Sequence, residues 1–459
     1  MSTSRASNSA AIDAFGDYAV TQVPKDQLKS PFGLFLVFTG VLVCIAVIWG
    51  GGSLGNSLSF KGMAVATVVG SLILGVIGFL TAAIGGYTRA STYVILRHPF
   101  GRIGSMFAGA AVSGIACGIG WFFIQSWLFA TVLQTIVGEV LGHVPFWASA
   151  PVAAFWGAML MTISAAYGYK GIAFLSYLAV PLFLIALGGG SYAAITEAGG
   201  FGAALKAQPA GTMTLSAAVT AVVGMYVAGA TITPDISRYS EKPKDGAWAW
   251  FWQVVLLQPV LMLAGGTLTL LTPASDVAKA MAHLGIGLGA LVLIVFGQWT
   301  TNDNNLYNGA LAFANTFRAK KVRVTITMGF IGAILASMTA AGVFGADPFI
   351  AFLTQLGRFL PPIAGVLIAD FYVYRPLLKG VSDPYQRYTF GPGTEYARYN
   401  AAGIVAWIVA GWLSPHLGGI TALNSIFLGF AVYLGVAVVA DILKVPMRFG
   451  TYTESSDGF

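Results

Sequence analysis

Long stretches of this chain contain no Asp, Glu, Lys or Arg. Examples run from Ile103 to Gly138, from Gly246 to Ser275 and from Tyr399 to Ala440. A helix needs about 20 predominantly apolar residues to cross a bilayer, so the shorter stretches hold one spanning helix and the longest holds two. Only 9% of the residues are charged, whereas soluble domains carry about 25%. The sequence therefore predicts an all-α polytopic membrane protein.

The hydrophobic pattern predicts about twelve spans, separated by short polar or charged segments. Their approximate bounds are 32–57, 62–87, 103–136, 146–168, 172–195, 213–234, 246–272, 281–316, 324–343, 347–372, 399–415 and 419–442. This divides the chain into a mobile cytoplasmic tail (1–30), a core of ten spans (31–372), a cytoplasmic loop (373–398), two further spans (399–443) and a second cytoplasmic tail (444–459). The first 30 residues are polar, so we expect no cleaved secretion signal.

The net charge of +7 indicates topology rather than nucleic-acid binding. If the N-terminus is cytoplasmic, 20 of the 24 Lys and Arg residues fall in inner tails and loops. Only Lys61, Lys206 and Lys279 fall in outer loops, and Arg358 falls within a span. The positive-inside rule then predicts that both termini are cytoplasmic and that the protein lies in the inner (plasma) membrane. Cys44 and Cys117 fall within spans, so neither a disulfide framework nor a zinc site is expected.

The predicted span 281–316 contains a dense polar run, Gln298-Trp299-Thr300-Thr301-Asn302-Asp303-Asn304-Asn305. Polar groups in hydrocarbon cost free energy unless they have partners or face water, so this run predicts a functional site. The hydroxyls of Thr300 and Thr301 and the carbonyl of Gly297 are oxygen ligands that suit sodium. The alternative for each hydroxyl is a hydrogen bond to its own helix.

The three asparagines of the run, Asn302, Asn304 and Asn305, each carry an amide that both donates and accepts. Such amides suit a planar ligand with amide-like edges. The three side chains point in different directions, so not all of them can face one ligand. For each amide the alternative role is hydrogen bonding between helices.

An aromatic residue and an amide share one face of the third span. Trp121 and Gln125 are four residues apart and lie one above the other on a helix, and glycines such as Gly118 leave room for a flat molecule. Tyr226 in the sixth span offers a second ring. Stacking of a base on an aromatic ring contributes roughly 1–3 kcal/mol.

Glycines also make the first and sixth spans candidates for broken helices. The first contains Gly40 and Gly50-Gly51-Gly52, and the sixth contains Gly224 and Gly229 followed by Pro234. Interrupted helices at matching positions of two halves indicate a transporter binding site. The alternative is close helix packing through small residues.

Several of these segments together resemble the nucleobase–cation symporter family, which contains cytosine permease and the sodium–hydantoin transporter. The matching segments are Trp299 to Asn304 with Leu306-Tyr307 and Phe313-Ala314-Asn315, Trp49 to Gly55, Val222-Val223-Gly224 with Thr231, Thr233, Asp235 and Arg238, and Pro361-Pro362 with Gly365 and Ile368 to Phe371. They are spread over most of the membrane region.

The resemblance implies a LeuT-type fold, in which two inverted repeats of five helices are followed by two more helices. It also implies secondary active import of a nucleobase, cytosine or purine-like, by alternating access and with sodium as the coupling ion. In this family the sodium ligands correspond to the carbonyls of Gly40, Val43 and Gly297 and to the hydroxyls of Thr300 and Thr301. Proton coupling stays open as an alternative.

The substrate site implied by the resemblance contains Trp121 as the stacking ring, Tyr226 as the second ring, and Asn302 or one of its neighbours as the span 8 amide. Gly118 replaces a Gln of cytosine permeases, Gln125 matches the hydantoin transporter, and Met225 replaces a small polar residue. A hydantoin, allantoin or pyrimidine-vitamin substrate is therefore an alternative.

The expected partners are a small heterocyclic substrate and membrane lipid, with no nucleic acid and no obligatory protein partner. An enzyme is disfavoured because the spans contain no paired catalytic carboxylates, histidine cluster or nucleophile–base arrangement. A sensor and a channel are weaker alternatives. No soluble signalling domain accompanies the spans, and broken helices suit occlusion better than a continuous pore.

Overall fold

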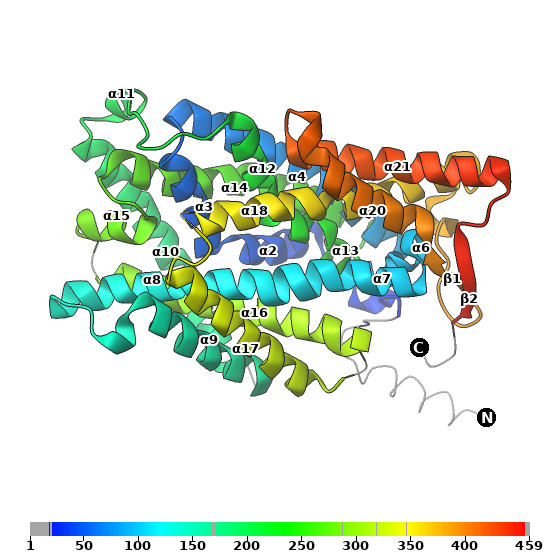
Figure 1. Ribbon diagram of the computed structural model, residues 1–459, viewed down its shortest axis with the longest axis horizontal. Helices are drawn as coiled ribbons and strands as arrows, with labels where there is room; N and C mark the ends of the chain where they lie inside the picture. Colours follow the sequence, from blue (N-terminus) through cyan, green and yellow to red (C-terminus); the bar gives the residue numbers. More distant parts are fainter. Residues whose placement is uncertain are drawn as a thin grey trace.

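The structure is a computed structural model that describes residues 18, 21–167, 170–286, 288–317, 319–345 and 347–454. Within its helices, the side chains of residues 167, 170–183, 288–297, 300, 311 and 315–317 lie outside the described part. The helices run roughly along the long axis of the molecule (Figure 1). Among the described residues, seven helices are long and apolar enough to cross a membrane, or eight if one bent pair forms a single span.

Helices occupy all the predicted spans, and the all-α prediction is confirmed. In chain order the spans are α2 (Pro31–Leu42) with α3 (Ile45–Gly55), α4 (Phe60–Thr88), α7 (Arg102–Gly109) with the π-helix η3 (Ala110–Trp121) and α8 (Phe122–Leu141), α9 (Ala150–Tyr167), α10 (Lys170–Glu197), α12 (Leu215–Thr231), α14 (Asp245–Leu271), α16 (Leu288–Phe317), α17 (Lys321–Ala340), α18 (Pro348–Phe359) with α19 (Pro361–Ala369) and the π-helix η5 (Asp370–Leu378), α20 (Ala401–Leu413) and α21 (Thr421–Leu443).

Short elements connect these spans. They are η2 (Lys25–Gln27), α5 (Thr92–Ile95), α6 (Arg97–Phe100), η4 (Phe146–Ala148), α11 (Phe201–Ala204), α13 (Pro234–Ser237), α15 (Val277–His283), η6 (Pro384–Gln386) and η7 (Ser414–Leu417). Cap residues mark where several helices begin. The side chains of Ser30, Ser59, Thr214 and Asp347 each accept a backbone N–H from the first turn of the following helix. This satisfies donors that a helix start leaves open.

The helices form two main packing groups that come together around the predicted site. In the first group α3, α4 and α12 pack with α14 and with one another. In the second, η3, α8, α9, α16 and α17 pack together. Glycines allow the closest approaches, since a Cβ on Gly51 would collide with the backbone of Met262 and a Cβ on Gly118 would lie 2.6 Å from the Cα of Gly309.

One end of the bundle carries a β-ribbon that the sequence analysis did not predict. Strand β1 (Glu395–Asn400) pairs antiparallel with β2 (Arg448–Thr453), with Asn400 opposite Arg448. The ribbon joins the segment between α19 and α20 to the segment after α21 (Figure 1). The predicted loop over 373–398 is therefore wrong at both ends, because η5 extends to Leu378 and β1 begins at Glu395. We call this end of the bundle the ribbon end.

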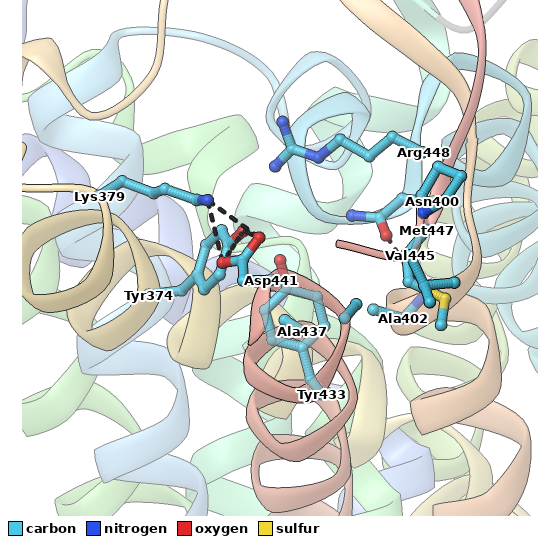
Figure 2. A pocket seen from close by; sticks show the side chains of 12 residues that line it. Tyr374, Lys379, Asn400, Ala402, Tyr433, Ala437, Asp441, Val445, Met447 and Arg448 are labelled. Carbon is cyan, nitrogen blue, oxygen red and sulfur yellow. Dashed lines mark hydrogen bonds and ion pairs between the residues drawn. The ribbon is translucent and has the colours of Figure 1, made fainter. Parts of the chain in front are cut away.

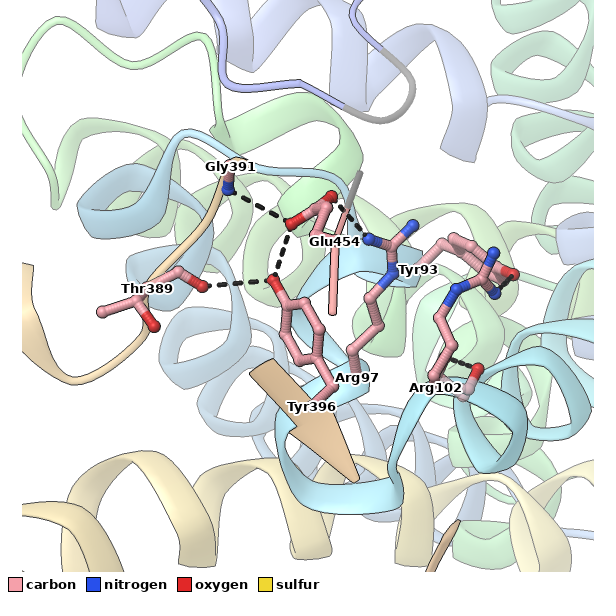
Figure 3. A network of polar contacts seen from close by, with 8 residues as sticks. Tyr93, Arg97, Arg102, Thr389, Gly391, Tyr396 and Glu454 are labelled. Atoms are coloured by element: carbon pink, nitrogen blue, oxygen red, sulfur yellow. Dashed lines mark hydrogen bonds and ion pairs between the residues drawn. The ribbon is translucent and has the colours of Figure 1, made fainter. Parts of the chain in front are cut away.

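Two buried carboxylates organise the ribbon end. Glu454 accepts from Nη1 of Arg97 at 2.9 Å, from the hydroxyl of Tyr396 at 3.2 Å and from the backbone N–H of Gly391 at 3.2 Å (Figure 3). Asp370 is fully buried. It accepts from Tyr388 at 2.7 Å, from Tyr433 at 2.5 Å and from Nε of Arg375 at 3.3 Å. Segments distant in sequence are thus tied together by charge-assisted hydrogen bonds.

The segment from 21 to 30 was expected to belong to a mobile tail, but it packs against the ribbon end. The backbone N–H of Val23 donates to the carbonyl of Arg89 at 2.9 Å, and that of Lys29 donates to the carbonyl of Tyr239 at 2.7 Å. Val23 is buried. These contacts hold the segment against the ends of α4 and α13, which corrects the expectation for these residues.

Candidate functional site

The first span is broken, as predicted, although not at the glycine triplet. α2 ends at Leu42, α3 begins at Ile45, and the two helices are bent by 57°. Val43 and Cys44 form the break, where the N–H of Cys44 donates to the carbonyl of Leu42 at 2.8 Å. The triplet Gly50–Gly52 lies inside α3, where its members contact α12, α14 and α15. Helix packing, the alternative role for these glycines, is what the structure shows.

The predicted break in the sixth span is wrong at Gly224 and Gly229. α12 continues through both residues to Thr231, and the chain leaves the helix only at Ile232 and Thr233, before α13. A Cβ on Gly224 would collide with the backbone carbonyl of Leu353 in α18. Gly224 therefore permits a close helix crossing, and its small size does not interrupt the helix here.

Hydrogen bonds between α8 and α16 fix how the polar run is oriented. Nε2 of Gln298 donates to the carbonyl of Gln125 at 3.0 Å, and Nδ2 of Asn302 donates to the carbonyl of Phe122 at 3.1 Å and to Oγ of Ser126 at 2.9 Å. Four-residue spacing places both donors on one face of α16. Asn302 thus binds two helices together, which is the interhelical alternative to substrate recognition.

The same contacts set an antiparallel register between η3–α8 and α16. Gln125 pairs with Gln298, Phe122 with Asn302, and Gly118 lies against Gly309. Residue numbers fall along η3–α8 in the direction in which they rise along α16. A residue between Asn302 and Gly309 therefore lies at the same depth as residues 118–122. Asn305 is therefore at the depth of Trp121.

Asn305 and Thr301 lie on a different flank of α16 from Asn302. Each helical residue is rotated by about 100° from the one before, so these two, four residues apart, share a sector about 60–100° away from Asn302. On the other side of Asn302, Trp299 donates to Oγ of Ser164 in α9 at 3.1 Å. The flank of Thr301 and Asn305 is thus the one that faces away from α9.

Four buried amide atoms in this region have no hydrogen-bond partner among the described residues: Oε1 of Gln298, Oδ1 of Asn302, Oε1 of Gln125 and Nδ2 of Asn305. Gln298 and Asn302 bind α8 through their other amide atom. The side chains of Gln125 and Asn305 form no hydrogen bond with any described residue, and their open atoms are an acceptor and a donor. Gln125 is 2% exposed. Leaving such groups without a partner costs about 1–3 kcal/mol each, and buried polar groups in native proteins nearly always have one. The pair therefore marks a position where a polar ligand would be accommodated. Asn304 is exposed.

Trp121 lies where the π-helix η3 gives way to α8 and is 7% exposed. The Trp121 ring packs edge to face against Phe352, with ring centroids 5.2 Å apart, and against Phe349 at 6.3 Å. Both phenylalanines belong to α18, and the sequence analysis missed them. Their position at the start of the tenth predicted span carried no signal that they would meet span 3.

The sixth-span residues are placed differently from the prediction. The Tyr226 ring stacks on Trp250 of α14, with centroids 4.8 Å apart, and its hydroxyl makes a long hydrogen bond of 3.5 Å to the carbonyl of Phe38. The structure does not bring Tyr226 against Trp121. Met225 is buried beside Gly50 of α3, which also lies near Phe349. Met225 thus lies near the aromatic cluster around Trp121.

Gly118 was predicted to line the substrate site, but the structure gives it a packing role. It lies between Gly309 of α16 and Met328 of α17. A larger side chain at this position would force η3 away from α16, since interiors are close-packed. The residue therefore sets the spacing of the two helices that carry Trp121 and Asn305.

The predicted cation ligands are only partly within the described residues. Gly40 lies in the last turn of α2 and Val43 in the break, and no hydrogen bond to the carbonyl oxygen of either is found among the described residues. Thr301 is half-buried on α16, a helix that contacts α3. The side chain of Thr300 and the surroundings of Gly297 fall outside the described part. The predicted ligand set stays a prediction.

Known proteins share this fold, which combines a broken first span, the polar helix α16 and the Trp121–Gln125 face of span 3. A family model described as permease for cytosine/purines, uracil, thiamine, allantoin matches residues 20–439. The chain belongs to this family. The permease is similar to the cytosine permease of Escherichia coli (strain K12), with 28% identity over 414 residues, covering 90% of this chain and 92% of that protein.

The permease is also similar to the hydantoin permease of Microbacterium maritypicum, with 23% identity over 432 residues that cover 87% of this chain and 84% of the relative. Its fold matches the solved structure of Mhp1, a nucleobase-cation-symport-1 family transporter in a closed conformation with bromovinylhydantoin bound. The TM-score is 0.72 at 18% identity, with 96% of this chain and 98% of that chain covered. The LeuT-type fold class is thereby confirmed, and the relatives are membrane permeases rather than enzymes.

Proposed function

We propose that this permease imports a nucleobase, cytosine or a purine-like ring, together with sodium by alternating access. The observation that carries the proposal is a pair of buried, unpartnered amide atoms at the depth of Trp121. Oε1 belongs to Gln125, which shares a helix face with Trp121, and Nδ2 belongs to Asn305. A flat heterocycle with one donor and one acceptor on its edge would satisfy both atoms while its face lies on the indole. This combines stacking with edge recognition.

The geometry also refines which asparagine recognises the substrate. Asn302 uses its Nδ2 on Phe122 and Ser126, so we assign it to helix packing. Asn305 lies at the depth of Trp121 and has its donor available, so we assign it to the substrate. Tyr226 would join the site only after its ring leaves Trp250.

Sodium coupling rests on the broken first span. The break at Val43 and Cys44 leaves backbone carbonyls without intrahelical partners, as in the discontinuous helices of transporters that bind sodium. An ion shared between these carbonyls and the hydroxyls of Thr300 and Thr301 would fix α2 and α3 relative to α16. Because such coupling is reciprocal, sodium would raise the affinity for substrate and substrate that for sodium.

We place the ribbon end on the cytoplasmic side of the plasma membrane. The segments at that end carry most of the positive residues, among them Arg97, Arg102, Arg375, Arg398 and Arg448, and positive residues favour the cytoplasmic side. One sodium ion moving inward with a neutral ring gains about 2.3 kcal/mol per 100 mV of membrane potential.

Uptake into proteoliposomes tests the proposal. We expect radiolabelled cytosine or a purine to accumulate with an inward sodium gradient, and an inside-negative potential to accelerate it. Thr301→Ala should weaken the sodium dependence more than Trp121→Ala does, whereas Trp121→Ala should weaken substrate affinity more. Uptake that ignores sodium but follows a pH gradient would overturn the sodium assignment, and absence of uptake for every nucleobase would overturn the substrate.

Hydantoin-like compounds are a second candidate substrate, favoured by Gln125 four residues after Trp121 and by the similarity to a hydantoin permease. The cyclic imide of a hydantoin also presents donors and acceptors on one edge. Competition decides between the two classes. Unlabelled hydantoin that displaces labelled nucleobase at lower concentration than the nucleobase itself would assign the site to hydantoins.

A further inference from the structure

A cavity of about 220 Å³ lies at the ribbon end, away from the proposed substrate site. It is enclosed by the end of η5, the end of α21, the start of α20 and the start of β2 (Figure 2). The side chains that matter for its chemistry are Lys379, Asp441, Arg448, Asn400 and Tyr374. Nothing in the proposed transport cycle requires this cavity.

The charged groups around the cavity leave one cation without a counter-charge. Nζ of Lys379 lies 2.9 Å from the carboxylate of Asp441, which also accepts from the hydroxyl of Tyr374 at 3.1 Å. Arg448 stands across the cavity and forms no ion pair with any described residue. With one carboxylate against two cations, the lining has a net positive charge.

An amide donor joins the guanidinium at the cavity. Oδ1 of Asn400 accepts from the backbone N–H of Ala402 at 3.2 Å and so caps α20. This orients Nδ2 away from the helix, and Figure 2 shows the nitrogen on the side of the amide toward Arg448 and the open space. The guanidinium of Arg448 and the amide N–H₂ of Asn400 are hydrogen-bond donors that suit an oxyanion. Arginine suits it best, because its planar N–H groups can donate two parallel hydrogen bonds.

The cavity lies at the level where the hydrocarbon of the membrane ends. The exposed Leu377 (74%) precedes Lys379 in η5, and the exposed Ile442 (72%) and Leu443 (64%) precede Lys444 at the end of α21. Apolar side chains followed by lysine at a helix end are typical of the headgroup region, where lysine extends its charge toward water. Two neighbouring helices therefore cross the same boundary on either side of the cavity.

We propose that this cavity binds the phosphate of an anionic phospholipid from the leaflet at the ribbon end. The phosphate would accept from Arg448 and Asn400, with Lys379 adding charge, while the acyl chains lie along the exposed faces of η5 and α21. Basic pockets between membrane helices are typical binding sites for such headgroups. A bound lipid would contact span 10, span 12 and the ribbon at the same time.

Native mass spectrometry of the full-length permease in detergent tests this, with phosphatidylglycerol, phosphatidylcholine and inorganic phosphate added in separate titrations. We expect Arg448→Gln to weaken phosphatidylglycerol binding about tenfold, as loss of a charged hydrogen bond predicts, and Arg448→Lys to recover part of it. Lys444→Gln is the matched control, because it removes the same charge from the same end but does not line the cavity. It should change binding less than twofold.

Arg448 and Lys444 are both exposed, so neither substitution should prevent folding, and elution from a sizing column checks this. A rise in unfolding temperature with phosphatidylglycerol, lost in Arg448→Gln and kept in Lys444→Gln, would support the site. Three results would overturn it: equal binding of both lipids, equal loss in both glutamine variants, or full displacement of the lipid by inorganic phosphate.

Discussion

The middle of the membrane region and the ribbon end both bury polar side chains, and both leave some polar atoms without a partner among the described residues. They differ in how the acidic and amide side chains at their centres are hydrogen-bonded. At the ribbon end each buried carboxylate has several partners: Glu454 and Asp370 each accept three hydrogen bonds. Around Trp121, by contrast, Gln125 and Asn305 each keep one amide atom without a partner among the described residues. The first arrangement stabilises one structure, whereas we propose that the second binds the substrate.

The difference shows how to distinguish buried polar side chains that hold helices together from those that bind a ligand in a membrane protein. Burial of a polar side chain within the membrane region is not sufficient evidence of a functional role, because Asn302 and Asn305 lie in the same run and differ in their hydrogen bonds. A donor already used between helices, as in Asn302, holds the scaffold. A buried donor without a partner lowers the stability of the fold, and a hydrogen bond to the substrate can remove that free-energy cost.

The largest expected effect concerns the ribbon end. Glu454→Ala leaves Arg97 buried without its counter-charge, and loss of one partner of a buried ion pair typically costs about 3–5 kcal/mol. We expect a marked fall in the unfolding temperature of the purified permease, with little change in substrate affinity of the protein that remains folded. The control is Glu197→Ala, because Glu197 pairs with His283 at the surface. Equal stability of the two variants would contradict the contrast.

A second prediction concerns His98, which lies in α6 and stacks on Tyr388 with ring centroids 4.1 Å apart. Burial, followed by the charges of Arg375, Arg448 and Arg97, holds the pKa of His98 well below its usual value of 6.5. A depressed histidine pKa means that the unfolded chain binds the proton more tightly. Stability is therefore fully present above about pH 6.5 and falls by up to about 1.4 kcal/mol per pH unit below it.

Thermal unfolding between pH 7.5 and pH 5 measures this dependence. His98→Phe keeps a ring against Tyr388 but removes the titrating group, so its curve should be flatter than that of the unmodified chain over this range. His283→Phe is the comparison, because His283 is exposed. A fall that persists unchanged in His98→Phe would assign the effect to other groups.

Much of the fold could be predicted because its signal is local. Apolar runs predict the spans to within a few residues at most of their ends. A break in span 1 was predicted correctly, although it lies at Val43 and Cys44 rather than at the glycine triplet. The β-ribbon was missed because β1 and β2 are short, polar and more than 40 residues apart. Only their contact across the ribbon end makes them strands, since an isolated pair of short strands is barely stable.

The candidate site could be predicted in composition but not in orientation. Trp121 and Gln125 share a face by their spacing alone, and the structure shows both buried. The choice among Asn302, Asn304 and Asn305 depends on which sector of α16 faces α8, and only hydrogen bonds such as that from Gln298 to Gln125 define it. The stacking of Tyr226 on Trp250 could not be predicted for the same reason, because Trp250 belongs to another span.

A third prediction examines the open acceptor directly. Gln125→Ala removes Oε1, and we expect substrate affinity to fall about tenfold, as one net hydrogen bond predicts. The unfolding temperature should change little, because that atom has no partner among the described residues. Ser126→Ala is the matched control one position along the helix, and binding isotherms for cytosine and hydantoin provide the measurement. An unchanged affinity would remove Gln125 from the site.

The smallest effects are expected from separate alanine substitutions of Asn302 and Asn305. They test most directly whether a bound donor and an open donor have different roles. Asn302→Ala removes the donor to Phe122 and Ser126, so stability should fall by about 1–2 kcal/mol while affinity stays within about twofold. Asn305→Ala should do the opposite, lowering affinity about fivefold at nearly unchanged stability. Unfolding temperature and substrate titration on both variants form a crossed test. If Asn302→Ala weakens binding more than Asn305→Ala does, then an open amide does not mark the substrate position in this permease.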